Sequence, residues 1–257
     1  MPEGPEVYNY YKYIKPYFEG QVFHNIEVLS GRYTKKPIQN LECLKKNSDS
    51  SVSVKGKTIY ISVGKHALVI THGMTAYWST ERSKYSRIMI ETSYGCIYYD
   101  DIRGFGTIRV TNDLQSALSD QGPDVLDDAT IYDKFYERLI TKKRKKIGAA
   151  LLEQKLVSGI GNYLRCEILW HAGIDGETMI KDLTPNEKDA LYKSAIDICR
   201  YHARKSSNLK RTPEDYDREF YVYMEDTDPY GNVVYKKKLG SRTLHYTQTQ
   251  GRNVKNE

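Results

Sequence analysis

Residues 151–174 have the sequence LLEQKLVSGIGNYLRCEILWHAGI, which contains a short glycine-rich segment between two apolar ones. Its centre, Gly159-Ile160-Gly161-Asn162, separates two segments in which apolar residues follow helical spacing. The two glycines let the backbone come close to a phosphate. Asn162 is expected to cap the second helix, whose N-terminus attracts anions. An ordinary helix–turn–helix corner has the same pattern, so the stretch indicates a phosphate clamp only in combination with its surroundings.

The surroundings are strongly basic in two places. Residues 134–146, directly upstream, contain seven Lys and Arg residues and one acid, which gives a local charge of +6. Residues 229–256 contain six Lys and Arg residues and no acid, which gives another +6. Because the whole chain carries only +6, its charge is segregated. Such segregation predicts a polyanionic partner such as nucleic acid, although each run by itself also fits a solvated face or a tail.

Upstream of residue 121 the chain is predicted to form a helix followed by strands. Apolar residues three and four apart predict a helix over 5–19, with Gly20 as its C-cap. Short runs rich in β-branched residues and separated by polar turns predict strands at 22–29, 58–63, 67–71, 87–91 and 107–110. This pattern is typical of a β-sandwich or barrel.

The turn-rich residues 121–124 mark the predicted domain boundary. The periodicity is helical over 130–141, 145–155, 162–171 and 184–205. The last helix has Thr184 as N-cap, Pro185 at N1 and Glu187 completing a capping box. Residues 216–250 return to β-prone aromatic sequence with a turn at 228–232. We therefore predict an α+β protein with domains at 1–121, 122–215 and 216–257.

Composition excludes several classes of protein. The 257 residues are 39% hydrophobic and 28% charged, which is ordinary for a globular chain and excludes dominant disorder. No run approaches the ~18 apolar residues of a membrane span, and the N-terminus has no signal-peptide pattern. The four cysteines show no CxxC spacing, so no zinc cluster or redox motif is predicted and an intracellular, reducing compartment is expected.

The N-terminus has the sequence MPEGPEV. Pro2 permits removal of the initiator Met, which exposes a secondary amine that titrates near pH ~8 and is partly nucleophilic at neutral pH. Attack on a sugar aldehyde carbon gives an iminium ion, and Glu3 or Glu6, near a helix start that favours carboxylates, can shuttle protons. Taken alone, the stretch fits a frayed terminus with two solvated acids better, because chain ends are commonly poorly ordered.

Several short motifs together resemble the formamidopyrimidine-DNA glycosylase/endonuclease VIII family, and the match runs over essentially the whole chain. The N-terminal and GIGN motifs are specific to this family, and the others support them. In chain order the motifs are MPEGPEV, Gly56-Lys57, His72-Gly73-Met74, DIRGFG at 101–106, Gly122-Pro123-Asp124 and Gly159-Ile160-Gly161-Asn162. The resemblance implies a bifunctional base-excision-repair glycosylase with an N-terminal β-sandwich, a helix–two-turn–helix domain and a C-terminal zinc finger.

The sequence departs from this family at the finger. The family has CxxCG, a hairpin, and then an Arg followed by CxxC, and residues 231–242 keep the hairpin spacing. The positions expected to be cysteine hold Thr227, Tyr230, Thr247 and Gln250, which with His245 do not make a zinc site. The chain therefore resembles the zincless-finger members, the endonuclease VIII-like glycosylases known from animals and large DNA viruses. We expect no metal and no cofactor, with Tyr, Val and Leu side chains stabilising the hairpin.

The resemblance implies catalytic roles for five residues. Pro2 is the Schiff-base nucleophile on the deoxyribose C1′, Glu3 is the acid that opens the sugar, and Glu6 is its supporting carboxylate. Lys57, beside the TIYISV strand, holds the phosphate of the damaged nucleotide and assists elimination. Arg242, a bidentate phosphate donor, completes this set.

The resemblance also implies a wider DNA contact. Asn162 and Arg242 bind phosphates that flank the lesion, and Arg144 is the expected further backbone contact from the basic run. The residues that match the family's void-filling triad are Met74, Arg103 and Phe105. Outside the family context, a Met and a Phe near strand ends are more often core residues.

These roles predict a DNA glycosylase/AP lyase that acts on damaged duplex DNA as a monomer and cleaves by β,δ-elimination. Family members that prefer 8-oxoguanine have a long loop before the finger. Residues 206–219 are short and polar, so oxidised pyrimidines and ring-opened purines are the expected lesions. The alternative is a catalytically silent DNA-binding module, which a retained Met1 would favour. A third alternative, an RNA-binding β/helical protein, is not favoured, because this sequence has no RRM-type aromatic signature.

Overall fold

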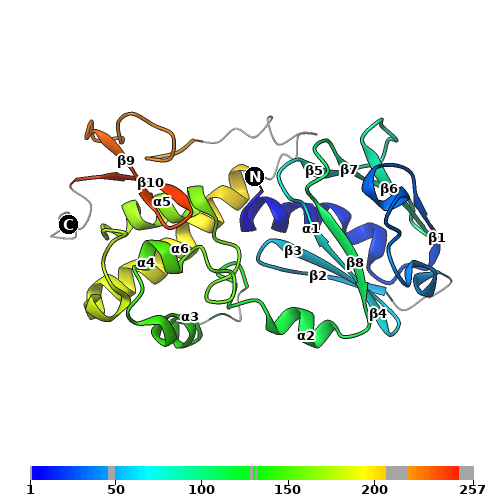
Figure 1. Ribbon diagram of the computed structural model, residues 1–257, viewed down its shortest axis with the longest axis horizontal. Helices are drawn as coiled ribbons and strands as arrows, with labels where there is room; N and C mark the ends of the chain where they lie inside the picture. Colours follow the sequence, from blue (N-terminus) through cyan, green and yellow to red (C-terminus); the bar gives the residue numbers. More distant parts are fainter. Residues whose placement is uncertain (1, 46–49, 128–129, 131, 207–218, 249–257) are drawn as a thin grey trace. The chain divides into compact units, whose positions relative to one another are not determined.

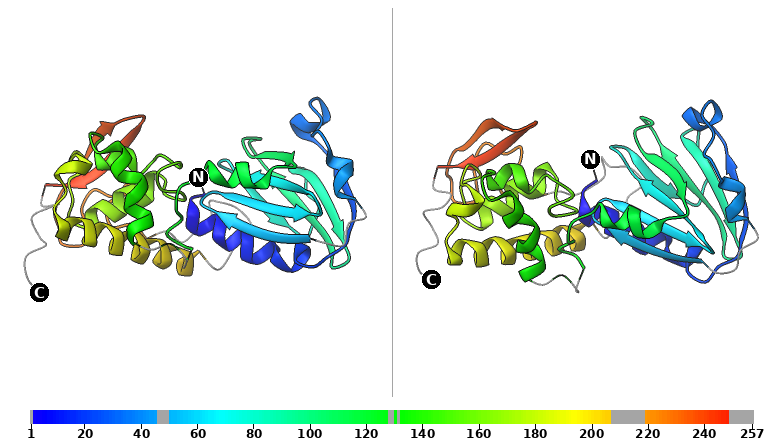
Figure 2. Two further views of the ribbon diagram at one scale, coloured as in Figure 1. Left: turned by 90° about the horizontal axis from the view of Figure 1, so that it is seen from below. Right: turned by 60° about the horizontal axis from the view of Figure 1, so that its bottom comes forward.

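The computed structural model describes residues 2–45, 50–127, 130, 132–206 and 219–248. The chain divides into two compact units, Met1–Ser119 with Ser206–Asp217 and Asp120–Lys205 with Arg218–Glu257. Strands dominate the first unit and helices the second, which also carries a C-terminal hairpin drawn in orange and red (Figures 1 and 2). The fold is α+β, as predicted; the three-domain division at 121/122 and 215/216 stays a prediction.

The first unit contains two four-stranded antiparallel sheets. One has the order β1 (Phe23–Val28), β6 (Ser86–Thr92), β7 (Gly95–Asp101) and β5 (Ala76–Ser79). The other has the order β2 (Ser50–Lys55), β3 (Thr58–Val63), β4 (His66–Thr71) and β8 (Thr107–Thr111). Alternate side chains, such as Ile88 and Ile90 of β6 and Ile59 and Ile61 of β3, are buried in one apolar core. The predicted sandwich is confirmed.

Helix α1 (Gly4–Phe18) confirms the predicted N-terminal helix. It buries Val7, Tyr10, Ile14 and Phe18, which are three and four residues apart, and it packs against β2, β3, β5 and β7. Gly20 follows the helix at φ 68°, a conformation that glycine adopts without strain.

Several elements of the first unit were not predicted. They are β2, β5, β7, the short helix α2 (Leu114–Ser119) and the 3₁₀ turns η1 (Gly31–Thr34) and η2 (Leu41–Leu44). Strand β7 ends on two aspartates, a residue type depleted in strands, and β2 is rich in serine, which is not among the residues enriched in strands. Pairing with β3 and β6 overrides these weak local preferences.

His72, which follows β4, is fully buried beside α1. Its ring stacks on Tyr10 of α1 with the centroids 4.5 Å apart, and Nε1 of Trp78 in β5 donates to His72 Nε2 at 2.9 Å. Because Nε2 accepts a hydrogen bond, the neutral ring carries its proton on Nδ1. Burial lowers the pKa of His72 to about 3, so the ring is neutral at pH 7.

The second unit is mainly helical. Its elements are α3 (Tyr132–Leu139), η3 (Ile140–Lys142), α4 (Ile147–Ala150), α5 (Asn162–His171), η4 (Ile180–Asp182), α6 (Pro185–Lys205), β9 (Val234–Leu239) and β10 (Arg242–Thr247). Helix α5 is buried over most of its length and packs against α6 and β10. Leu239 and Leu244 of the hairpin extend the same apolar core. Within the described segments, the structure has no helix with the length and apolar content needed to cross a bilayer.

Helix boundaries in this unit differ from prediction at one important place. The prediction of one helix over 145–155 is wrong, because α4 ends at Ala150 and turns follow it. The Gln154 side chain explains this: its Oε1 accepts from Gly159 N at 3.1 Å, and its Nε2 donates to Ile160 O at 2.8 Å. The capping box of α6 is confirmed, with Thr184 N donating to Glu187 at 2.8 Å and Glu187 N donating to Thr184 at 3.2 Å.

Buried carboxylates tie the finger region to α5. Glu167 of α5 accepts backbone hydrogen bonds from Tyr221, Val222 and Tyr223 at 2.7–3.0 Å. Asp228 accepts from the backbone of the 228–232 turn and from Trp170 Nε1 at 3.2 Å. These bonds give the segment a fixed path, and the one expected cysteine position among the donors, Tyr230, takes part through its backbone amide.

The expected cysteine positions have unrelated environments. Thr227 forms a β-bridge with Val233, Tyr230 stacks on Trp170 with the centroids 6.0 Å apart, and Thr247 is buried at the end of β10. Gln250 lies outside the described residues. Across the parts of the chain that the structure describes, no group of three or more His, Cys, Asp or Glu residues could hold a metal ion.

We predict that prolonged chelation leaves the melting temperature unchanged, because hydrogen bonds and apolar packing stabilise the finger. Asp228→Ala is the matched destabilised variant. It leaves the Trp170 indole and turn amides without their acceptor and should cost about 1–3 kcal/mol in denaturant unfolding. Stoichiometric zinc by elemental analysis, together with a lower melting temperature after chelation, would contradict the prediction, because a structural metal contributes folding energy.

We also predict an acid sensitivity that originates at His72. The unfolded chain protonates this residue near pH ~6.5. The folded chain protonates it only near pH 3. As the pH is lowered, the unfolded state therefore binds the proton first. The free energy of unfolding decreases across this window, by about 2 kcal/mol from pH 6.5 down to pH 5. His72→Gln keeps an acceptor for Trp78 but cannot ionise, so it should lose less stability.

The measurement is urea unfolding at each pH, followed by Trp78 fluorescence in a Trp170→Phe background. His24→Gln, at an exposed position of β1, is the control and should behave like the parent protein. An identical pH dependence in the parent and in His72→Gln would show that His72 does not take up a proton on unfolding.

Candidate active site and nucleic-acid interface

The N-terminal residues are ordered by α1. Pro2 is buried, Glu3 is the N-cap residue, and the Glu3 and Glu6 side chains are only 3% and 1% exposed. Glu3 N donates to Glu6 Oε2 at 2.7 Å, which places the second carboxylate over the first turn of the helix. The helix dipole favours negative charge at this end. The two acids are therefore buried, in contrast to the solvated acids of a frayed terminus.

Lys57 lies in the tight turn between β2 and β3. Gly56 has φ 59°, and Lys55 pairs with Thr58 across the turn, so the backbone conformation of the turn requires glycine at that position. The Lys57 side chain is half-buried. Both strands that enter the turn pack against α1, the helix that carries Glu3 and Glu6.

Met74, Arg103 and Phe105 form a surface cluster, which we call the Met74 cluster. The guanidinium of Arg103 lies 4.8 Å from the Phe105 ring centroid, and its Nη1 lies 3.8 Å from Met74 Sδ. Met74 is 39% exposed and Phe105 is 51% exposed. Two large apolar side chains are thus presented to solvent beside a cation; that these three residues act together on DNA stays a prediction.

Asp101, at the end of β7, organises the loops that carry the Met74 cluster. Its carboxylate accepts from Gly106 N at 2.7 Å, Gly104 N at 3.0 Å and Thr75 Oγ1 at 3.1 Å. Gly73 has φ 57°, and a Cβ there would lie 2.5 Å from the Phe105 carbonyl carbon. The two loops therefore pack backbone to backbone around one buried carboxylate. Sequence analysis assigned Asp101 no role, although it begins the DIRGFG motif.

Asn162 is placed differently from the expectation. The N-cap of α5 is Gly161, and Asn162 is the first helical residue, so the prediction that Asn162 caps the helix is wrong. Its side chain turns to the hairpin instead: Nδ2 donates to Thr243 O at 3.0 Å. Arg165, one turn further along α5, donates through Nη2 to Asn162 Oδ1 at 2.6 Å. Sequence analysis missed Arg165, because an arginine at helical spacing looks like a solvated residue.

Arg242 and Arg144 are both exposed residues of the second unit. Arg242 begins β10 and pairs with Leu239 across the hairpin. Arg144 belongs to the basic run between η3 and α4. Asn162 and Arg242 are close in the fold, since Asn162 contacts the residue that follows Arg242.

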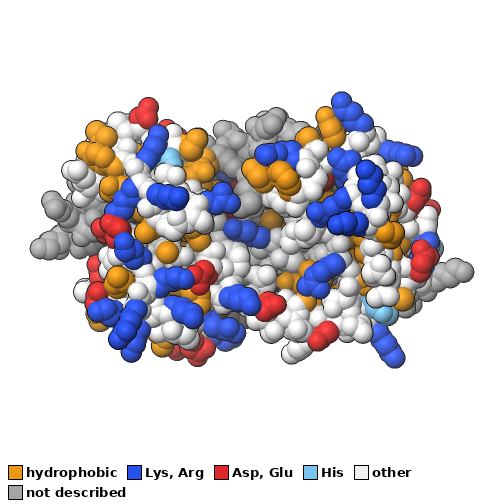
Figure 3. Space-filling view, in the orientation of Figure 1, with side chains coloured by type: hydrophobic (Ala, Val, Ile, Leu, Met, Phe, Trp, Pro, Cys, Tyr) orange, Lys and Arg blue, Asp and Glu red, His pale blue; other side chains and the backbone are white. Residues whose placement is uncertain are grey.

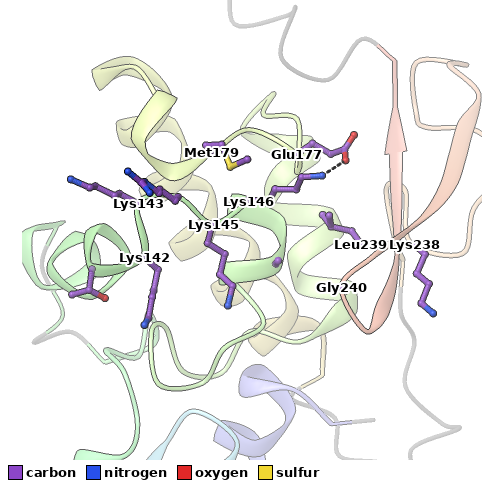
Figure 4. Close-up of a pocket in the computed structure, with 12 residues that line it drawn as sticks. Lys142, Lys143, Lys145, Lys146, Glu177, Met179, Lys238, Leu239 and Gly240 are labelled. Carbon is purple, nitrogen blue, oxygen red and sulfur yellow. Dashed lines mark hydrogen bonds and ion pairs between the residues drawn. The ribbon is translucent and has the colours of Figure 1, made fainter.

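The basic run lines a pocket of ≈ 810 Å³ in the second unit (Figure 4). Residues 141–146 form one side and residues 238–240 another, with Glu177 and Met179 between them. Lys146 donates to Glu177 at 2.7 Å, while Lys142 and Lys145 point away from this pair. Glu177 also contacts Lys237, and the two lysines lower the pKa of Glu177 to about 2. Lys and Arg side chains are spread over this unit's visible surface, with acidic and hydrophobic side chains between them (Figure 3).

Two family models match the chain in order. The model of the formamidopyrimidine-DNA glycosylase N-terminal domain matches residues 1–108, and the model of the H2TH domain of the same enzymes matches residues 121–210. Between them they account for most of the two units described above.

Individual relatives match over nearly the full length. Formamidopyrimidine-DNA glycosylases from Exiguobacterium sp. and Lactococcus lactis subsp. cremoris are 26% and 28% identical; they align with 96% of this chain and with 98% and 97% of their own lengths. Endonuclease 8 from Shigella sonnei is 33% identical over 131 residues, which is 49% of this chain and 50% of that protein.

Solved structures of such enzymes are similar to this chain over nearly the same length. The complex of Lactococcus lactis Fpg with abasic-site DNA has a TM-score of 0.79 at 25% identity and covers 95% of this chain and 97% of that one. MutM in complex with DNA containing carbocyclic 8-oxo-G has a TM-score of 0.77 at 25% identity and covers 96% and 98%. Both domains of one family match this chain in the expected order, and individual relatives align over nearly the full length of this chain and of their own. This chain therefore belongs to the formamidopyrimidine-DNA glycosylase/endonuclease VIII family.

Proposed function

We propose that the protein is a bifunctional DNA glycosylase and AP lyase that removes oxidised bases from duplex DNA through a Schiff base formed by Pro2. The observation that carries the proposal is the buried pair of carboxylates, Glu3 and Glu6, directly after Pro2 at the start of α1. Two acids are kept out of water beside a chain end whose amine becomes nucleophilic once Met1 is removed. Membership of the glycosylase family supports the same activity.

The chemistry of the first step follows from the residue types. The Pro2 nitrogen attacks the deoxyribose C1′, and the damaged base leaves with the electron pair of its glycosidic bond. Glu3 donates a proton as the sugar ring opens, and Glu6, hydrogen-bonded to the Glu3 backbone, orients it. Because proline is a secondary amine, the resulting Schiff base has no N–H to lose and stays a cationic iminium.

The iminium then drives strand cleavage. It withdraws electrons from C2′, a proton leaves that carbon, and the C3′–O bond breaks as the 3′ phosphate departs. A second elimination expels the 5′ phosphate, and water hydrolyses the remaining iminium to release Pro2. Lys57 lies in the turn between β2 and β3, the two strands that pack against α1. From there it neutralises a phosphate beside the reacting sugar.

The base can reach this site only if it leaves the helical stack. The Met74 cluster supplies a suitable wedge, because Met74 and Phe105 expose apolar surface and Arg103 adds a cation that holds both. Insertion of these side chains fills the space that the extruded nucleotide vacates. Asn162, Arg242 and Arg144 are the proposed backbone contacts of the second unit.

Oxidised pyrimidines and ring-opened purines are the proposed lesions. The support is the short polar segment before the finger, of which residues 207–218 lie outside the described residues. The names of the relatives, formamidopyrimidine-DNA glycosylase and endonuclease 8, are compatible with this range. The hairpin is proposed to work without zinc, and the enzyme to act as a monomer.

Borohydride trapping tests the proposed nucleophile. We expect the wild type, with Met1 removed, to form a covalent adduct with abasic-site DNA at residue 2. Pro2→Gly should trap less, and a form that retains Met1 should not trap. Pro5→Ala, in the same turn of α1, is the control and should trap like the wild type. Trapping of Pro2→Gly or of the Met1 form at the wild-type level would refute the assignment, and binding without any trapping would identify a silent DNA-binding module.

The salt dependence of binding tests the proposed phosphate contacts. Lys57→Ala and Arg242→Ala should each weaken binding to every lesion alike and lower the slope of log K against log salt by about 0.9, because one fewer counterion is released. Asn162→Ala removes no charge. It should weaken the free energy of DNA binding by about 1–3 kcal/mol and leave the slope of log K against log salt nearly unchanged.

Lys45→Ala is the matched control, because this lysine is paired locally with Glu42 and should leave affinity and slope unchanged. Lys57→Ala should also slow cleavage of DNA that is already bound. A changed ranking among lesions with an unchanged slope in Arg242→Ala would place Arg242 at a base edge or outside the interface.

A further inference from the structure

Arg165 is an unusual residue for the centre of a helical domain. It lies on α5 and is 0% exposed, although arginine is rarely buried without compensating contacts. Its position, one helical turn after Asn162, puts the two side chains on the same face of the helix. Burial of such a costly group calls for a specific role.

The guanidinium connects three separate segments of the second unit. Nη2 donates to Asn162 Oδ1 at 2.6 Å and to Thr243 O of β10 at 3.0 Å. Nη1 donates to Gly148 O of α4 at 3.3 Å and to Leu239 O of β9 at 3.4 Å. The planar fork of arginine suits this arrangement, because its donors diverge in one plane. A lysine has no such fixed geometry.

These contacts fix the orientation of the Asn162 amide. Arginine only donates hydrogen bonds, so the Asn162 oxygen must face Arg165 and its NH₂ must face away. That NH₂ donates one hydrogen to Thr243 O, the same carbonyl that Arg165 binds. The remaining hydrogen of the NH₂ is thereby aimed in one direction, which preorganises it for a phosphate oxygen.

The same contacts fix the hairpin beside Arg242. Thr243 follows Arg242 in β10, and Leu239 is the cross-strand partner of Arg242. Arg165 therefore binds the backbone on both sides of the turn at 240–241. Because strand geometry determines where the Arg242 side chain emerges, a fixed hairpin gives the Arg242 guanidinium a fixed starting point relative to Asn162.

We infer that Arg165 is a positioning residue that holds Asn162 and the Arg242 segment of the hairpin in one fixed arrangement for phosphate binding. The inference rests on the proposed function, in which Asn162 and Arg242 bind DNA phosphates. It adds a residue that touches no DNA and acts through both. In a finger whose expected cysteine positions hold no cysteine, a buried guanidinium ties the hairpin to the helices.

A double-mutant cycle tests the inference, with affinity for a duplex containing a tetrahydrofuran abasic-site analogue as the readout. Arg165→Lys, which keeps the charge but not the fork, should weaken binding roughly tenfold or more. It should leave the salt slope unchanged, because Arg165 binds no phosphate itself. In the Arg165→Lys background, Asn162→Ala should add less than about a twofold loss, because Asn162 has already lost its orientation.

Glu167→Gln is the matched control. Glu167 is also buried on α5, but it binds the backbone of residues 221–223. The fold-losses in affinity caused by Glu167→Gln and by Asn162→Ala should therefore be independent and multiply in the double variant. Independent effects of Arg165→Lys and Asn162→Ala would overturn the inference, and a lower salt slope in Arg165→Lys would show direct phosphate contact instead. Failure of the wild type to bind the duplex would contradict the proposed function, whereas binding with independent effects would contradict only the role of Arg165.

A second measurement keeps the inference testable if Arg165→Lys does not fold. Asn162→Ala retains Arg165 but removes one tie to Thr243, so amide hydrogen exchange of the hairpin, residues 234–247, should become faster, while exchange in α6 stays unchanged. Unchanged exchange in the hairpin would mean that Asn162 and the hairpin are not coupled, and the inference would fall.

Discussion

The hydrogen bond from Glu3 N to the Glu6 carboxylate is the constraint on which the proposed chemistry depends. A chain end is normally the least ordered part of a domain, yet an N-terminal nucleophile must be held in place. Here the first helix begins immediately after the nucleophile, and its capping box closes over the same residues that supply the acids. The packing of α1 against both sheets then fixes this end of the chain within the first unit.

The same physical solution recurs at each functional loop. Asp101 accepts hydrogen bonds from the loops of the Met74 cluster, Gln154 binds the backbone of the glycine-rich turn, and Arg165 binds the hairpin. Each is a polar side chain that satisfies backbone groups which secondary structure leaves unpaired. Exposed residues such as Met74 and Arg242 can then occupy defined positions although they make few contacts of their own.

Periodicity in the sequence predicts the elements that bury a regular face, such as α1, α6 and the strands predicted at 58–63 and 87–91, which the structure shows as β3 and β6. It fails where side chains make specific contacts: Gln154 binds the backbone beyond the end of α4, within the helix expected over 145–155, and Asn162, expected to cap α5, contacts Arg165 while Gly161 is the N-cap. Motifs identify the residues that are proposed to contact DNA. The supporting roles of Asp101, the first residue of the DIRGFG motif, and of Arg165 could not be predicted, because a buried charged residue is indistinguishable from a solvated one until its partners are known.

Charge counted along the sequence also overstates what is available to DNA. Of the cations in residues 134–146, Lys145 is paired with Glu153 and Lys146 with Glu177, and Glu177 also neutralises Lys237 of the hairpin. A lysine that already has a carboxylate partner gains less from a phosphate and contributes less to counterion release. The other cations of this run, Lys134, Arg138, Lys142, Lys143 and Arg144, are exposed, while Lys146 connects the run to the hairpin through Glu177. The basic segments thus divide into cations that remain exposed to the proposed DNA partner and cations that are paired with carboxylates of the protein itself.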